Sequence, residues 1–391
     1  PKQAGDPYPE KDLAGVGLSY KLAQALVSQM KAHQALPSGY VAPEECLDLV
    51  AVGTVADLAP LTGENRALVR AGLKCIREPK REGILSLIQV SGLKYNRISA
   101  TDIGFILGPR LNAAGRLESA LAAFQLLSTH DVFEAGMLAQ RLDDQNRERQ
   151  QITREIQALA EKIALGEDPN ALLIFAADPS FNSGVVGLAA SRLSELYYRP
   201  AIVAQRGETS TRASCRSIIE FHITEALDQC ADLLERYGGH AAAAGFTVKN
   251  ENLPALIARL NQIAQNQLAA LDLRPTLPAD IEVPLSELNA EMIRYLDWLQ
   301  PTGYGNPQAV FVSRNLKVRQ ARTVGKDSAH LKLTVTDGYL TNEAIAFRQG
   351  HWYNRLPAYI DLMYTFEINE FNGQKSFQLN VRDLKASGTA D

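Results

Sequence analysis

The sequence predicts a multidomain α/β protein, and three changes of hydrophobic pattern along its 391 residues carry that prediction. The first part of the chain repeats apolar residues at helical spacing. From Ala171 onward, short apolar runs alternate with helical segments, and beyond about Leu273 short β-type segments follow one another. A chain of this length with 46% hydrophobic residues exceeds one ordinary domain, so we expect two or three packed domains.

Residues 1–128 are predicted to be mainly helical. Apolar positions recur at helical spacing from Lys11 to about Gln34 and again from Cys46 to Leu58. Residues 129–168 are highly polar with a thin apolar stripe, which predicts one long and largely exposed helix. Such a helix usually connects two domains.

Residues 169–272 predict an α/β domain in which helices cover a sheet. We expect strands at 172–176, 201–204, 212–217 and 244–248, and helices at 185–196 and 224–236. Prolines at 275, 278 and 284 then mark a boundary. Within 273–391, a short helix at 287–299 precedes five predicted strands, at 310–318, 330–336, 343–347, 361–369 and 376–381. Five short strands of this kind fit a small Greek-key barrel.

Composition gives no overall sign of nucleic-acid binding. The formal net charge is −4, so a polyanion would have to bind in a local groove. Four scattered cysteines without a CxxC pair argue against zinc and fit reduced thiols. The longest apolar run, residues 171–177, is far shorter than the ~20 residues of a membrane span, and no signal stretch opens the chain. We therefore expect a cytoplasmic protein with no membrane partner.

Several segments carry residue types suited to phosphate binding. Gly238, Gly239 and His240 could form a turn whose main-chain N–H groups and imidazole face a phosphate, although a tight turn with a capping histidine explains them equally well. A glycine-containing loop at 183–187 opens a predicted helix, which is a natural anion site. The candidates in and after that loop are Ser183, Gly184, Ser191 and Arg192.

A predicted strand adds a row of polar side chains. Because strand residues alternate between faces, Arg212, Ser214 and Arg216 share one face and Ser217 points to the other. Further upstream, Arg110, Asn112 and Arg116 flank a glycine-containing turn, where a loop and a helix start could bring them to one anion. Structural ion pairing is the alternative for these arginines.

Two further features have structural alternatives. Asp57 ends an apolar helical segment just before a proline, so it is either a helix-end cap or a semi-buried functional carboxylate. Basic residues recur at helical spacing between 66 and 81, and for these a solvated helix face is favoured over a nucleic-acid contact. They are Arg66, Arg70, Lys74, Arg77 and Arg81.

The segment Gly238-Gly-His-Ala-Ala-Ala-Ala-Gly245 resembles the signature of the domain that accompanies Asp-His-His (DHH) phosphoesterases. The resemblance extends over nearly the whole chain to the RecJ family of single-strand exonucleases. It includes Leu47 to Arg66, with the Gly-Thr-Val-Ala-Asp segment that ends at Asp57, and the Arg-Leu-Asn-Ala-Ala-Gly-Arg motif at 110–116. In one departure, Phe181-Asn182 stands where the family usually has Trp-His.

This resemblance implies a domain organisation. Residues 1–128 would be the C-terminal part of a DHH α/β lobe, and 129–168 the connecting helix. Residues 169–272 would be the DHH-associated α/β domain, and 273–391 an OB-like barrel. In that barrel, bases would stack on aromatic side chains beside basic ones, although core aromatics are the alternative. The barrel candidates are Phe347, Arg348, Trp352, Phe371 and Lys375.

The resemblance also implies an activity, metal-dependent 5′ to 3′ hydrolysis of single-stranded DNA in repair and recombination. Asp57 would be one ligand of a two-ion Mn²⁺ or Mg²⁺ site. Because the chain begins Pro1-Lys-Gln without a methionine, we expect a fragment whose family metal-binding motifs lie upstream, and which by itself does not cut DNA. A single-strand-binding protein or a helicase would be a further partner.

Two other readings stay open. In one, the protein is a non-catalytic relative that binds single strands or replication proteins as a scaffold. In the other, it hydrolyses very short oligonucleotides, a reading that a strand-binding barrel disfavours.

Overall fold

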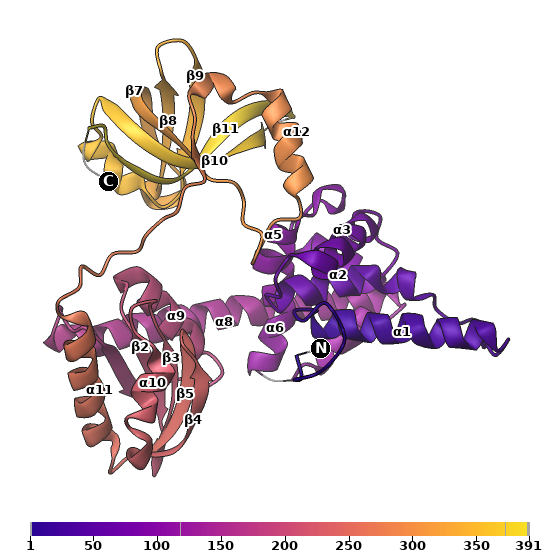
Figure 1. Ribbon diagram of the computed structural model, residues 1–391, viewed down its shortest axis with the longest axis horizontal. Helices are drawn as coiled ribbons and strands as arrows, with labels where there is room; N and C mark the ends of the chain where they lie inside the picture. Colours follow the sequence, from indigo (N-terminus) through magenta and orange to yellow (C-terminus); the bar gives the residue numbers. More distant parts are fainter. Residues whose placement is uncertain (1, 118, 372, 389–391) are drawn as a thin grey trace. The chain divides into compact units, whose positions relative to one another are not determined.

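The computed structural model describes residues 2–117, 119–371 and 373–388. They form two compact units, shown as a ribbon in Figure 1. The first unit contains Pro1–Arg77, Ile98–Gly104 and Leu277–Asp391, and the second contains Glu78–Arg97 and Phe105–Thr276. Within the described residues, no helix is long and apolar enough to cross a membrane.

The first unit begins with three packed helices, α1 (Gly15–Ala32), α2 (Leu47–Ala56) and α3 (Gly63–Arg77), which confirms the helical prediction. Gly72 lies where α3 crosses α2, and a Cβ there would stand 2.1 Å from the carbonyl oxygen of Leu47. Only glycine therefore allows this close helix contact. The fully buried Asn65 joins the loops around the helices, accepting from the Ala14 N–H and donating to the Asp12 and Pro60 carbonyls.

The same unit ends in a closed barrel. Its strands are β6 (Ile281–Glu282), β7 (Phe311–Val324), β8 (His330–Thr336), β9 (Thr341–Ala346), β10 (Tyr359–Phe371) and β11 (Gln374–Ala386). The strand order is β10-β11-β9-β8-β7-β6, and an additional pairing of β10 with β7 closes the sheet. Alternate side chains such as Leu331, Leu333 and Val335 fill the interior. The predicted barrel is confirmed, with β7, β10 and β11 longer than expected and with the short β6 in addition to the five predicted strands.

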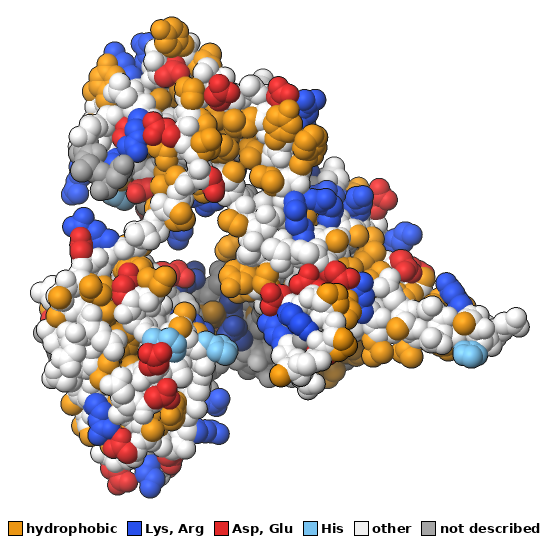
Figure 2. Space-filling view, in the orientation of Figure 1, with side chains coloured by type: hydrophobic (Ala, Val, Ile, Leu, Met, Phe, Trp, Pro, Cys, Tyr) orange, Lys and Arg blue, Asp and Glu red, His pale blue; other side chains and the backbone are white. Residues whose placement is uncertain are grey.

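Two residues of the predicted basic stripe bind a helix end. Lys and Arg side chains gather over α3 (Figure 2). The Arg66 guanidinium donates to the carbonyls of Trp298 and Leu299 at 3.0 and 2.9 Å, and Arg70 Nε donates to the Gln300 carbonyl at 3.2 Å. These carbonyls end α12 (Ala290–Leu299), where the helix dipole favours cations. Two of the arginines are therefore C-terminal caps of α12.

The second unit opens with helices packed around α8 (Val132–Glu167), which has 36 residues. Its first half contacts α4 (Glu82–Val90), α6 (Gly108–Leu117) and α7 (Leu121–Ser128). The expectation of a largely exposed helix is wrong, because one face is buried along most of its length and includes polar side chains. The buried polar residues are Asp143, Gln145, Asn146 and Thr153.

The α/β part of the second unit is a five-stranded sheet with the order β1-β2-β3-β5-β4. Its strands are β1 (Ile174–Asp178), β2 (Ala201–Arg206), β3 (Ser210–Arg216), β4 (Leu234–His240) and β5 (Ala243–Lys249). Only β1 and β2 among these pairs are parallel. The helices are α9 (Val186–Tyr197), α10 (Ile223–Asp228) and α11 (Leu253–Leu268).

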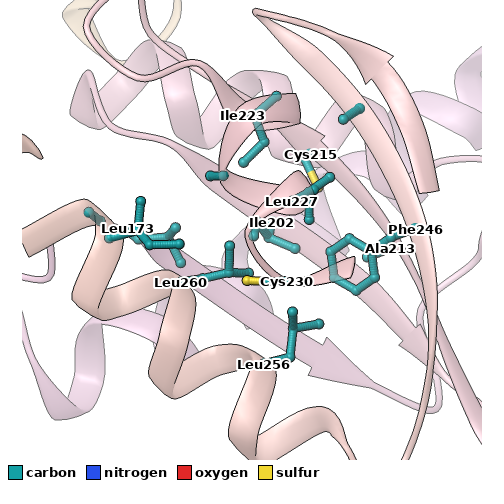
Figure 3. Close-up of a cluster of buried hydrophobic side chains, with 14 of the residues drawn as sticks. Leu173, Ile202, Ala213, Cys215, Ile223, Leu227, Cys230, Phe246, Leu256 and Leu260 are labelled. Carbon is teal, nitrogen blue, oxygen red and sulfur yellow. The ribbon is translucent and has the colours of Figure 1, made fainter. Parts of the chain in front are cut away.

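The two faces of this sheet are covered differently. On one face, Leu256 and Leu260 of α11 belong to the same buried core as Phe246 and Cys215 of the sheet (Figure 3). Burial raises the pKa of the Cys215 thiol to about 12, so this cysteine is a packing residue. On the other face, α8 and α9 cover β1 and β2, with Val203 among the buried side chains. The remaining strands on that face carry the candidate site.

One element was predicted with the wrong structure. The helix expected at 224–236 ends at Asp228, and Leu234–His240 forms the edge strand β4. Gly238 and Gly239 disfavour a helix, and this segment satisfies its backbone groups by pairing with β5 from Leu234 to His240. Tertiary pairing therefore overrides the local helical pattern.

Candidate phosphate and nucleic-acid site

Polar side chains and glycines line one face of β3, β5 and β4. Residues directly opposite each other on neighbouring strands point to the same face, as do residues two positions along. Three such cross-strand rows lie on the face left open by α9. They are Arg212–Thr247–Arg236, Ser214–Gly245–Gly238 and Arg216–Ala243–His240. The structure therefore brings the β3 and Gly-Gly-His candidates onto one surface.

This surface contains a groove of about 370 Å³ between the start of α9 and the sheet. Ser183 and Val186 line it from the α9 end, and Arg212, Ser214 and Arg236 line it from the strands. Gly245 lines the groove, and its register partner Gly238 would have open space around a Cβ. Bare backbone at two adjacent strands lets a ligand approach the sheet closely.

The Gly-Gly-His segment is a strand end and not the predicted turn. Gly239 faces Ala244, and a Cβ on it would stand 2.3 Å from the Ala243 carbonyl oxygen. This glycine therefore allows close strand contact, and it does not build a phosphate-binding loop. The carbonyls of the following turn accept from the Ser217 and Ile223 N–H groups. The exposed His240 ends the strand.

The ends of α6 and β3 meet the first turns of α9. A Cβ on Gly184 would stand 2.3 Å from the Arg116 carbonyl oxygen, and Arg116 Nη1 lies 3.4 Å from the Gly184 carbonyl oxygen. A Cβ on Gly187 would touch the side chains of Ser214 and Arg216 at 3.4 Å. The two glycines therefore let both arginines lie against α9.

Four guanidinium groups gather around this part of α9. Burial, with the positive charges of Arg116 and Arg192, lowers the pKa of Arg149 on α8. Burial likewise lowers the pKa of Arg216, with Arg116 contributing again. Among the described residues, no carboxylate pairs with any of these four arginines. Such a group of cations favours an anion.

Arg149 is the member of this group that sequence reasoning missed. The sequence feature that could have indicated this residue is its position within the apolar stripe of the long helix. The partial burial of Arg149 could not be predicted from the polar composition of that helix, which is typical of an exposed helix.

Some candidates have structural partners. Arg110 donates from Nε to Oδ1 of Asp143 at 2.9 Å, and that carboxylate is 1% exposed, so the ion-pair alternative describes Arg110. The whole motif lies in helix α6, where six residues separate Arg110 and Arg116 by about 240° of rotation and prevent convergence on one anion. The exposed Asn112 lies one turn before Arg116.

Two serine hydroxyls are also occupied. The hydroxyl of Ser217 donates to the Phe221 carbonyl at 2.6 Å, and that of Ser191 donates to the Gly187 carbonyl at 3.1 Å. A serine hydroxyl can still accept through its lone pairs, but its proton is used within the fold. Phosphate binding by these two residues stays a prediction.

Phe181 and Asn182, which stand in place of Trp-His, have structural roles. Phe181 is 1% exposed in the core between α8, α9 and the sheet. The Asn182 side chain accepts from the Gly184 N–H at 2.8 Å and so shapes the turn that opens α9.

Asp57 lies in the first unit, at the C-terminal end of α2, with an exposed side chain. Its backbone N–H donates to the Gly53 carbonyl at 3.0 Å, and no hydrogen bond to its carboxylate is formed by the described residues. A carboxylate at the negative end of a helix is unfavourable, so the capping alternative does not fit.

A metal ion would need further ligands. In the described parts of the chain, no three His, Cys, Asp or Glu side chains are placed so that they could hold a metal ion together. An exposed carboxylate oxygen suits Mg²⁺ or Mn²⁺, so Asp57 fits as one ligand of a site that other residues would complete.

The residues predicted to bind a single strand on the barrel differ in their exposure to solvent. Phe347 is 52% exposed and lies edge-on to His330, whereas Trp352 packs against the barrel core. Arg348 and Lys375 are exposed. The side chain of Phe371 lies outside the described residues.

Two family matches agree with this architecture. Residues 170–266 match the DHHA1 domain, and residues 279–383 match the RecJ OB domain. The pair defines the class as DHH-type phosphoesterases.

Curated relatives narrow the class. The chain is 36% identical over 391 residues to the single-stranded-DNA-specific exonuclease RecJ of Bacillus subtilis, covering 99% of this chain and 48% of that protein. It is 35% identical to the protein of that name from Dickeya dadantii, covering 96% of this chain and 68% of the relative.

Crystal structures of RecJ from Thermus thermophilus are also similar. The structures in complex with Mg²⁺ and with Mn²⁺ both match with a TM-score of 0.83 and 32% identity, covering 98% of this chain and 57% and 55% of those chains. The chain belongs to the RecJ family of single-stranded-DNA-specific exonucleases. It spans about half the length of the Bacillus subtilis relative.

Proposed function

We propose that this chain binds single-stranded DNA and positions its phosphates for hydrolysis, as part of a metal-dependent RecJ-type exonuclease. The observation that carries the proposal is the open face of β3, β5 and β4, where Gly238 and Gly245 leave the backbone bare. Beside this face, guanidinium groups gather around α9, and no described carboxylate offsets their charge. The names of the relatives agree with that reading.

The residues of this face and of the neighbouring helices α6 and α9 would bind different parts of the DNA backbone. Arg116, Arg192 and Arg216 donate to phosphate oxygens, since a guanidinium suits planar, bidentate contacts with phosphate. The bare backbone at Gly238 and Gly245 lets the DNA strand lie close to the sheet, and the imidazole of His240 donates to a phosphate at the end of β4. These contacts orient a phosphodiester and hold it in place.

Divalent ions would supply the chemistry of hydrolysis. Mg²⁺ or Mn²⁺, with Asp57 as one ligand, would activate water and offset the charge that develops on the phosphate. Because the described residues form no three-ligand cluster, other residues would have to complete the site. The 391-residue chain by itself is therefore expected to bind single strands without cutting them.

The barrel would hold the strand away from the point of cleavage. Phe347 offers an exposed ring for base stacking, and Arg348 and Lys375 offer charge for the backbone. We further propose 5′ to 3′ degradation, a role in DNA repair and recombination, and contact with a single-strand-binding protein or a helicase.

The first experiment compares binding of labelled single-stranded and double-stranded oligonucleotides to the 391-residue chain in chelator. Binding to the single strand with a strong salt dependence is expected, and equal or absent binding would refute the proposal. The longer protein is then assayed with Mn²⁺ on strands labelled at either end, which tests cleavage and its polarity.

The absence of a three-ligand cluster within the described residues favours one alternative, a non-catalytic scaffold that binds single strands. The longer protein distinguishes the two. Metal-dependent cleavage supports the nuclease, whereas tight binding without cleavage at any Mn²⁺ concentration supports the scaffold.

A further inference from the structure

Arg149 occupies a buried stripe of the long helix. Positions three or four apart on a helix share one face. Arg149 lies on such a face of α8, which contacts α6 and α7 along its first half and α9 and β1 along its second. Its buried neighbours on that face are Leu142, Asn146, Thr153, Ile156 and Ala160. Arg149 itself is half-buried, so its guanidinium is partly removed from solvent.

The side chain is held in place by its own helix. Arg149 Nη2 donates to Oδ1 of Asn146 at 2.9 Å, and Asn146 is 2% exposed. The hydroxyl of Thr153 donates to the Arg149 carbonyl at 2.7 Å. Arg149 Nε, however, is a buried atom to which the described residues offer no hydrogen-bond partner. A buried donor without a hydrogen-bond partner costs free energy, which leaves this guanidinium incompletely paired within the fold.

The helix α8 also contains a carboxylate that forms ion pairs with two other arginines. Two turns earlier, the buried Asp143 carboxylate pairs with Arg110 at 2.8 Å and with Arg147 at 2.7 Å. No carboxylate in the described part of the chain pairs with Arg149, and its charge is opposed by Arg116 and Arg192. A half-buried charge with only like charges nearby is unfavourable, and a bound anion would offset it.

We propose that Arg149 is a phosphate-binding residue, whose guanidinium joins those of Arg116, Arg192 and Arg216 around one backbone phosphate of a single strand. A phosphate oxygen accepts from the guanidinium of Arg149 and offsets the four like charges. The inference rests on the proposed function, since it requires that this unit bind a single strand. It adds a fourth arginine, placed by the connecting helix.

The test replaces Arg149 by Met, which keeps the length of the side chain and removes its charge. Arg154→Met is the matched control, because Arg154 is an exposed arginine on the same helix. Both variants of the 391-residue chain are measured in chelator with a labelled single-stranded oligonucleotide, from about 50 to 200 mM KCl. Arg149→Lys, which keeps the charge and loses the planar fork, is a third variant.

We expect Arg149→Met to weaken binding about tenfold or more and to lower the slope of log affinity against log salt by about 0.7. Arg149→Lys should weaken binding while keeping the slope, and Arg154→Met should match the unchanged protein. Without DNA, the melting temperature of Arg149→Met should stay close to that of the unchanged protein, because removal of a half-buried charge offsets the lost hydrogen bond to Asn146.

Two results would overturn the inference. Unchanged affinity and salt slope for Arg149→Met, while Arg116→Ala weakens binding, would leave the proposed function standing and exclude Arg149. A melting temperature lowered by several degrees in Arg149→Met would show that the residue is structural. If the unchanged chain does not bind the single strand, the proposed function itself fails before the variants are compared.

Discussion

Replacing Asp57 by Asn should have opposite effects on stability and on activity. The carboxylate is exposed at the C-terminal end of α2 and forms no hydrogen bond with the described residues, so it contributes repulsion and little else to folding. A unit charge about 5 Å from the half charge at a helix end, at an effective dielectric of about 80, experiences about 0.4 kcal/mol of repulsion. Asp57→Asn removes it.

The expected gain in the free energy of unfolding is therefore about 0.4 kcal/mol, or roughly 1 °C in melting temperature. Calorimetry and urea titration of the 391-residue chain measure it at low salt, where the dipole is least screened. Asp131→Asn is the control, because Asp131 accepts from the Glu134 N–H at the N-terminus of α8. Asn caps about as well as Asp, so this control should show no gain.

In the longer protein, the same Asp57→Asn change should reduce Mn²⁺-dependent cleavage of a labelled single strand at least about a hundredfold, since a catalytic ion contributes several kcal/mol. Binding of the strand in chelator should hardly change. Near-normal cleavage at saturating Mn²⁺ would refute the ligand assignment. A clear loss of stability would instead show that the carboxylate supports the fold.

Three further changes test other parts of the structure. Arg116→Ala should weaken single-strand binding about tenfold with an unchanged melting temperature, and equal losses in both measurements would contradict a phosphate contact. Replacing both Arg66 and Arg70 by Met should lower the free energy of unfolding by about 1 kcal/mol through loss of the α12 caps, whereas Lys74→Met should not, as urea titration would reveal. Burial raises the pKa of Glu367, so the folded state binds its proton more tightly and this contribution to stability is present below the ordinary pKa and lost as pH rises through the folded value. Glu367→Gln should therefore flatten the fall in stability above about pH 4.5, and an unchanged pH profile would contradict that burial.

The architecture was largely predictable because hydrophobic periodicity is local. Helices over 11–34 and 46–58, the change of period after Ala171 and the five barrel strands all follow from the spacing of apolar residues, and the structure confirms them. The segment at 224–240 shows the limit of such reasoning. Its second half is a strand because β5 offers a partner, and local sequence does not encode that partner.

The site was predictable in its residue types and only partly in their geometry. Alternation placed Arg212, Ser214 and Arg216 on one face, and the register extends that face across β5 to His240. Spacing could not reveal that Arg110 pairs with Asp143, since the partner lies 33 residues away on another helix.

The sequence by itself determined the order of the domains and the chemical character of the groups that would meet a phosphate, since both depend on residue type and short-range spacing. Only the tertiary structure decided which of those groups have partners within the fold. Burial and ion pairing depend on residues far apart in the chain. That is why Arg149, in a helix that looked exposed, became the candidate that the long-range contacts added.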